Sequence, residues 1–174
     1  MLRPADDSLM RGLAEGRDEA FADLYDRFAP SLLRVAMRLL GSQQDAEDAV
    51  QEVFVGVVRA RARLPTVENL RAYLFAALRR AAGRLASARR ECVLSPEQEQ
   101  ALAAPEATGV DSERAVHLER ALRTLPHEQR EIVSLKIEAG LTFAEIAGVL
   151  AISPNTAASR YRYALEKLRD ALEA

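Results

Sequence analysis

The sequence predicts an all-α protein with two small helical domains, joined by an acidic linker, and a helix-turn-helix in the second domain. Apolar residues recur at spacings of three and four along most of the 174-residue chain. Alanine, leucine, arginine and glutamate dominate, while glycine and proline are sparse, which is a composition typical of helices. An acidic stretch without sustained periodicity interrupts this pattern. We therefore predict domains at 1–90 and 112–174, with the linker at 91–111.

The first strong period covers residues 20–40. Because proline removes a backbone donor and clashes with the preceding turn, Pro30 is expected to kink this helix or divide it. Gly41 is a stop signal for the helix, and either Ser42 or Asp45 can cap the next one.

That next helix, "DAEDAVQEVFVGVVRA", has apolar residues on one face and acids on the other. "RLPTVEN", at 63–69, is predicted to be a loop, and residues from Asn69 to about Arg90 are helical again. Tyr73 lies on the apolar stripe of that helix and is expected in the core. Phe75 lies off the stripe, so we expect it to be exposed or to face a partner.

The segment at 91–111 contains two prolines and many acids, which is typical of a linker between domains. The alternative is a short tether that has no further role. After it, Ser112 is predicted to cap a helix that reaches about Thr124. Pro126 opens the following helix and Gly140 closes it.

The last two helices form the predicted helix-turn-helix. Thr142 and Glu145 make a capping box for the first of them, and Ser153 caps the second, with Pro154 at its first position. The connection "AIS" has three residues, a length suited to a steep crossing of two helices. The residues of the last helix expected to face the core are Ala157, Tyr161, Ala164, Leu165, Leu168 and Leu172.

Charge is distributed unevenly although the net charge is only −2. Residues 59–90 contain nine arginines and one acid, whereas residues 91–113 contain six acids and no lysine or arginine. Arginines with interleaved aromatics favour binding of phosphate and unpaired bases. Polar and cationic residues on the outer face of the last helix favour major-groove contacts. From the residues alone, the charged blocks can also be solvated helix faces, and the last two helices can also be a helical hairpin in a core.

Several classes of function find no support in the sequence. There is no phosphate-binding glycine loop, nucleophile elbow or HExxH motif, so we expect no enzyme, no cofactor and no metal site. The single cysteine cannot form an internal disulfide, which fits a reducing cytoplasm. No segment has the length and hydrophobicity of a membrane span, so we expect no membrane insertion.

Three segments, in this order, resemble the extracytoplasmic-function (ECF) group of bacterial RNA polymerase sigma factors. "DAEDAVQEVF" is similar to the polymerase-binding helix of sigma region 2. "LRAYLFAALRRAAGRLASARR" is similar to the segment that follows, which melts the promoter and reads the minus-ten element. The sequence from Ala121 to Leu172 resembles region 4, which reads the minus-thirty-five element. The resemblance covers residues from about Phe21 to Leu172.

The resemblance implies that core RNA polymerase, promoter DNA and an anti-sigma factor are the partners. Residues implied to bind polymerase are Asp48, Gln51, Glu52 and Phe54. Residues implied to contact DNA around the minus-ten element are Arg71, Arg79, Arg80 and Arg84. Residues implied to face the minus-thirty-five element are Asn155, Thr156, Ser159, Arg160 and Arg162. The loop 64–69 lies where the family captures a flipped base, and the acidic linker would run near the RNA exit path.

The chain departs from the family pattern at a few positions. Arg80 and Arg84 stand where Asn and Asp are common, which leaves open whether these arginines read bases or only phosphates. Ala151 replaces a frequent glycine in the turn, and Ala158 replaces a frequent lysine. A helix-turn-helix regulator that is not a polymerase subunit, or a sigma-like adaptor that binds only protein, is the alternative.

Overall fold

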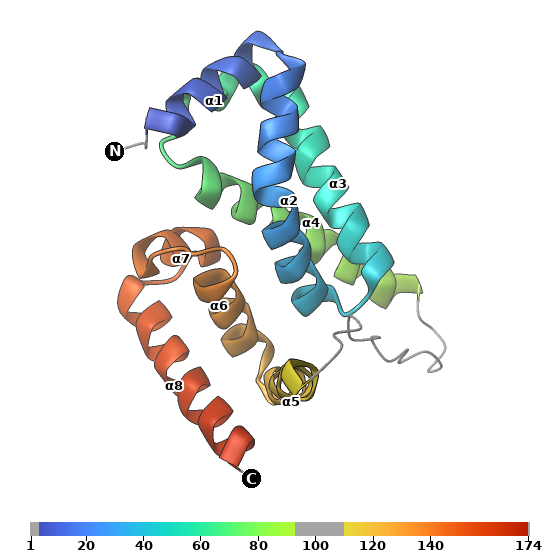
Figure 1. Cartoon of the computed structure of the whole chain (residues 1–174), viewed down its shortest axis with the longest axis vertical. Helices are drawn as coiled ribbons and strands as arrows, with labels where there is room; N and C mark the ends of the chain where they lie inside the picture. Colours follow the sequence, from blue (N-terminus) through green and yellow to red (C-terminus); the bar gives the residue numbers. More distant parts are fainter. Residues whose placement is uncertain (1–3, 93–109, 174) are drawn as a thin grey trace.

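The computed structural model describes residues 4–92 and 110–173, and these residues form helices without any strand (Figure 1). The central part of the predicted linker, 93–109, lies outside the described residues. The elements are α1 (Pro4–Glu15), α2 (Asp18–Leu40), α3 (Gln43–Ala60), η1 (Arg61–Thr66), α4 (Leu70–Cys92), α5 (Val110–Thr124), α6 (His127–Ile137), α7 (Phe143–Leu150) and α8 (Pro154–Glu173). The predicted all-α fold is confirmed.

Of the two effects predicted for Pro30, a kink or a division, the division does not occur, because α2 is one continuous helix. Pro30 is exposed, while Phe28, Leu32 and Val35 are buried on the other side of α2. Burial of that apolar face holds the helix together across the proline, because tertiary packing supplies most of the stability of a helix in a protein.

The predicted caps around α3 are present. Gly41 ends α2 in the left-handed conformation, with φ of 70°, which a glycine adopts without steric cost. Ser42 is the residue that caps α3, since its side chain accepts a hydrogen bond from the backbone N–H of Asp45 at 3.3 Å.

The segment after α3 is a 3₁₀-helix, η1, which covers residues 63–66 of the loop predicted at 63–69. Leu64 is completely buried and belongs to the same core cluster as Leu9 and Leu13 of α1. Hydrophobic burial against α1 thus orders a segment whose proline and polar residues resemble a loop.

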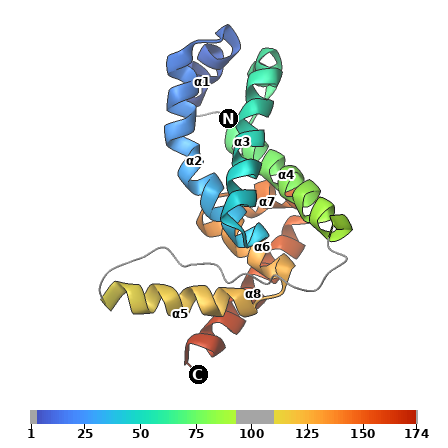
Figure 2. The same cartoon turned by 90° about the vertical axis from the view of Figure 1, so that its right-hand side faces the viewer.

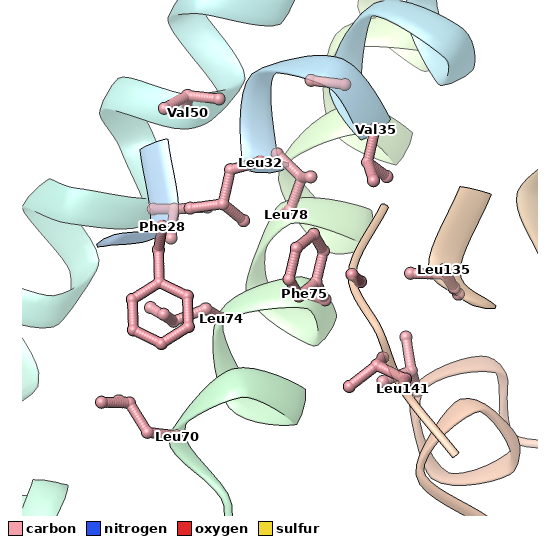
Figure 3. Packing of buried hydrophobic residues seen from close by; sticks show 14 of the residues in the cluster. Phe28, Leu32, Val35, Val50, Leu70, Leu74, Phe75, Leu78, Leu135 and Leu141 are labelled. Atoms are coloured by element: carbon pink, nitrogen blue, oxygen red, sulfur yellow. The ribbon is translucent and has the colours of Figure 1, made fainter. Parts of the chain in front are cut away.

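The two halves of the chain share one hydrophobic core (Figure 3). Phe75 is 1% exposed, and Figure 3 shows its ring between α4 and the side of the core formed by Leu135 and Leu141. The prediction that Phe75 is exposed was therefore wrong. Helix α4 has a second buried face, because α7 of the C-terminal half packs on it. Helix α6 of the same half packs on α2.

A smaller cluster holds α5 and α8 together within the C-terminal half, and Figure 2 shows these helices crossing. Ala164 and Leu168 are buried there, as predicted, but Leu165 and Leu172 are 38% and 44% exposed. The predicted core positions of those two leucines are therefore wrong. Ser112 is also not the cap of α5, because the helix already begins at Val110.

The helix-turn-helix has the predicted local structure. Thr142 and Glu145 form both hydrogen bonds of the capping box before α7. Ser153 accepts a hydrogen bond from the backbone N–H of Thr156 at 3.0 Å, which caps α8. Ala151 adopts the left-handed conformation, with φ of 55°, at the turn. An alanine pays a steric penalty there that the glycine common in the family would avoid.

Candidate functional site

An apolar groove of about 970 Å³ lies between α2 and α3. Tyr25 and Phe54 stand in it with ring centroids 5.0 Å apart, and Tyr25 is 56% exposed. Val55 and Val58 extend the apolar lining along α3. Large apolar side chains left in a concave surface are typical of a protein-binding site.

The four predicted polymerase-binding residues differ in their relation to the groove. Gln51 and Phe54 line the groove, whereas Asp48 and Glu52 are exposed but do not line it. The carboxylate of Glu52 instead forms an ion pair with Arg84 of α4. Sequence reasoning missed Tyr25, because a tyrosine within an apolar period is usually buried.

The predicted minus-ten arginines divide into two sets. Arg71 donates a hydrogen bond to the carbonyl of Ala139 at 2.9 Å and lies over the ring of Phe28 at 5.3 Å. Arg79 pairs with Glu131 of α6 at 2.9 Å. Both arginines are therefore bound to the C-terminal half of the chain.

Arg80 and Arg84 lie on the other side of α4. They line a shallow hollow together with Ser87, and Arg80 has no ion-pair partner within the described part of the chain. Both guanidinium groups are within reach of an approaching phosphate, because Arg80 is exposed and the pair of Arg84 with Glu52 is a surface pair.

The predicted base-capture loop ends at a polar pocket of about 540 Å³ between the two halves. Asn69, just before α4, donates a hydrogen bond to the carboxylate of Glu145 at 2.5 Å. Burial tends to raise the pKa of Glu145, but hydrogen bonds from Thr142 and Asn69 and the charge of Arg71 outweigh it. The pKa of Glu145 is lowered as a result, which keeps its carboxylate charged.

The predicted minus-thirty-five residues begin at the exposed N-terminus of α8. Asn155 is exposed, and its carbonyl accepts a hydrogen bond from the hydroxyl of Ser159 at 2.8 Å. The hydroxyl of Thr156 lies 2.8 Å from that of Ser153. These groups border the helix N-terminus, which attracts phosphate.

The two arginines of α8 point to different neighbours. Arg160 pairs with Glu128 at the start of α6 at 2.9 Å, whereas Arg162 lies over the ring of Tyr163 at 5.3 Å. Tyr163 is 51% exposed beside Arg162 and is a surface aromatic that the sequence reading did not select. Its only sequence signal is its position next to a predicted DNA-binding residue.

No described helix has the length and hydrophobicity needed to cross a membrane. Among the described residues, no group of histidine, cysteine and carboxylate side chains has the arrangement of a metal site.

Two segments of the chain match known protein families. Residues 24–91 match Sigma-70 region 2, and residues 116–168 match Sigma-70 region 4. The chain is 30% identical to the RNA polymerase sigma factor CarQ of Myxococcus xanthus, over 94% of this chain and 95% of CarQ. It is also 30% identical to the ECF RNA polymerase sigma factor SigK of Mycobacterium tuberculosis, over 96% of this chain and 93% of SigK.

A solved structure shows the same fold. CnrH, in complex with the cytosolic domain of CnrY, aligns with a TM-score of 0.70 over 97% of both chains, at 23% identity. The paired region 2 and region 4 matches define an RNA polymerase sigma factor. Together with the relatives, they show that this chain belongs to the ECF group of that family. It is a promoter-directing sigma factor, and the alternative of a regulator outside the polymerase is excluded.

Proposed function

We propose that the α2–α3 groove docks this sigma factor on core RNA polymerase, with Gln51 and Phe54 as its centre. The supporting observation is the contact of the exposed Tyr25 with the half-buried Phe54, in an apolar groove whose lining residues all come from α2 and α3. Buried aromatics in such pockets dominate the binding energy of protein interfaces. Asp48 and Glu52 would form the charged rim, which influences the association rate more than the affinity.

We further propose that the minus-ten region is held by the four arginines of α4 and that α8 reads the minus-thirty-five element. Arg80 and Arg84 would bind phosphates of the displaced strand, while Arg71 and Arg79 would bind only when released from α6 and the turn after it. On α8, the predicted set is Asn155, Thr156, Ser159, Arg160 and Arg162. The domain division at 1–90, 91–111 and 112–174 belongs to this proposal, and the family segments at 24–91 and 116–168 support it.

Core polymerase and promoter DNA are the partners of any sigma factor, and the chain would act on them in the cytoplasm without catalytic residues of its own. The complex of CnrH with the cytosolic domain of CnrY supports a similar protein partner here, which would act as an anti-sigma factor.

Groove variants test the docking site. Gln51→Ala with Phe54→Ala should weaken binding to core polymerase by about thirtyfold, as expected for a hot spot worth about 2 kcal/mol. Gln44→Ala is the matched control, because Gln44 is exposed on the same helix and does not line the groove. Unchanged affinity of the double variant, measured by fluorescence anisotropy, would exclude the groove as the docking site.

Run-off transcription tests the function as a whole. Core polymerase supplemented with this chain should transcribe a subset of a promoter library that core polymerase alone does not. A library without any such transcript would refute promoter direction by this chain.

A further inference from the structure

Gly83 is an exposed glycine in the interior of the long helix α4. Glycine destabilises a helix interior relative to alanine, because its backbone loses more conformational freedom on folding. Close packing against another segment is a common reason for a glycine at such a position. It does not apply to Gly83, because a Cβ built on this residue would meet no other segment within 4 Å. The packing of the fold therefore does not account for this glycine.

The missing side chain contributes to the hollow on the surface of α4. The hollow is lined by Arg80, Gly83, Arg84, Ser87 and Ala88. Residues three and four positions apart lie on the same face of a helix, so the two arginines and the serine border one surface. No carboxylate lines the hollow, and the glycine and the alanine are too small to fill it.

The donors around the hollow are accessible to a ligand. Within the part of the chain that the structure describes, Arg80 has no ion-pair partner and the hydroxyl of Ser87 has no hydrogen-bond partner, and both side chains are exposed. Arg84 donates to the carboxylate of Glu52 from its Nη2 group. A guanidinium carries five N–H donors, so this contact leaves others for a ligand.

The chemistry of the hollow favours a phosphate. Guanidinium groups bind phosphate oxygens through charge-assisted hydrogen bonds, and one phosphate can accept from two arginines and a hydroxyl together. A base edge lies at the end of an extended arginine side chain, whereas a ligand in this hollow lies beside the helix backbone between the two arginines. The nine arginines and one acid of residues 59–90 favour a polyanion as the source of that phosphate.

We propose that the hollow holds one backbone phosphate of the displaced promoter strand, with Gly83 as its floor and Arg80, Arg84 and Ser87 as its donors. Glycine serves here as it does elsewhere, by allowing a close approach of a ligand to the backbone. The inference rests on the proposed role of α4 in holding the minus-ten region, and it adds Gly83 and Ser87 to that role. A phosphate carries no sequence information, so discrimination between promoters depends on residues outside the hollow.

Gly83→Gln tests the site in the full-length chain, because glutamine fills the hollow without changing the net charge. The affinity for a fluorescent oligothymidine of about 20 nucleotides, measured by anisotropy, should fall about fivefold. The slope of log K against log salt should become shallower by about 0.7, the change expected for one phosphate contact of a single strand. Glutamine is a better helix former than glycine, so urea unfolding should show at least the original stability.

Two variants control for the size and the place of the substitution. Gly148→Gln is the matched control, because Gly148 of α7 is also exposed and a Cβ there also has no neighbour within 4 Å. It should leave the affinity and the salt slope unchanged. Gly83→Ala adds only one methyl group to the hollow and should reduce the affinity in the same direction by about twofold.

The oligonucleotide measurements decide between a phosphate site and its alternatives. Unchanged affinity and salt slope in Gly83→Gln, or an equal loss in Gly148→Gln, would overturn the phosphate site. Oligodeoxycytidine of the same length should show the same relative loss as oligothymidine. A loss confined to one of the two would mean that the arginines read bases, which would also overturn the inference.

Run-off transcription with core polymerase separates this site from the proposed function. Gly83→Gln should lower every transcript that the unsubstituted chain directs by a similar factor, since the contact is independent of sequence. A loss confined to some promoters would contradict the inference. If the unsubstituted chain directs no transcript at all, the proposed function fails, while the oligonucleotide measurements still decide the phosphate site.

Discussion

Phe75 provides a sharp test of how the two halves are held together. Its side chain is 1% exposed and is part of the core cluster that includes Leu135 and Leu141 of the C-terminal half. Phe75→Ala removes a buried ring, and such substitutions cost about 3–5 kcal/mol. With a urea m value of about 2 kcal/mol/M, the midpoint of unfolding should fall by about 2 M.

The assay is urea unfolding of the full-length chain, followed by circular dichroism. Tyr25→Ala is the matched control, because this aromatic is 56% exposed in the groove and its removal should change the free energy of unfolding by less than about 1 kcal/mol. A midpoint for Phe75→Ala within about 0.5 M of the unsubstituted chain would refute the shared core. The phenylalanine would then be exposed, as the apolar stripe alone predicts.

Three further predictions concern the helix-turn-helix. Because the folded pKa of Glu145 is lowered, its charge stabilises the protein above the usual carboxyl pKa, and this stabilisation is lost as the pH falls through the folded pKa. Glu145→Gln should therefore reduce the free energy of unfolding at pH 7, and this loss should shrink as the pH falls through the folded pKa of Glu145. A loss that does not change with pH would exclude the charge as the cause. Ala151→Gly should stabilise the fold by about 1 kcal/mol in thermal unfolding, since it relieves the left-handed conformation, whereas Gly140→Ala should destabilise it. Lower stability of Ala151→Gly would contradict this. Arg160→Ala should weaken binding to the upstream promoter element by about 1–3 kcal/mol if Arg160 leaves Glu128 for a base; equal losses on all DNA sequences in a mobility-shift assay would show a phosphate contact.

Local signals were read correctly from the sequence where the interaction is itself local. Ser42, Ser153 and the Thr142–Glu145 capping box depend on hydrogen bonds between residues three positions apart. The order of the helices follows from such periodic and capping patterns, whereas the family was indicated by the resemblance of three segments to known sigma factors. Element boundaries were less certain, as at Ser112, because helix ends depend on contacts outside the helix.

Errors arose where burial depends on a distant segment. Phe75 lies off the stripe that faces α2 and α3, and only the C-terminal half explains why it is buried. Leu165 follows the buried Ala164 in the sequence, yet its side chain is 38% exposed. The 3₁₀-helix η1 is ordered by α1, a partner that its own residues do not indicate.

By itself, the sequence determined the helical fold, the helix-turn-helix and the sigma family, because these depend on patterns along the chain. Only the tertiary structure decided which site residues are accessible. It pairs Arg79 with Glu131 and Asn69 with Glu145, while Arg80 and the groove at Phe54 remain open. The physical reason is that an ion pair or a buried ring depends on distance in space, and these partners are 52 to 76 positions apart in the chain.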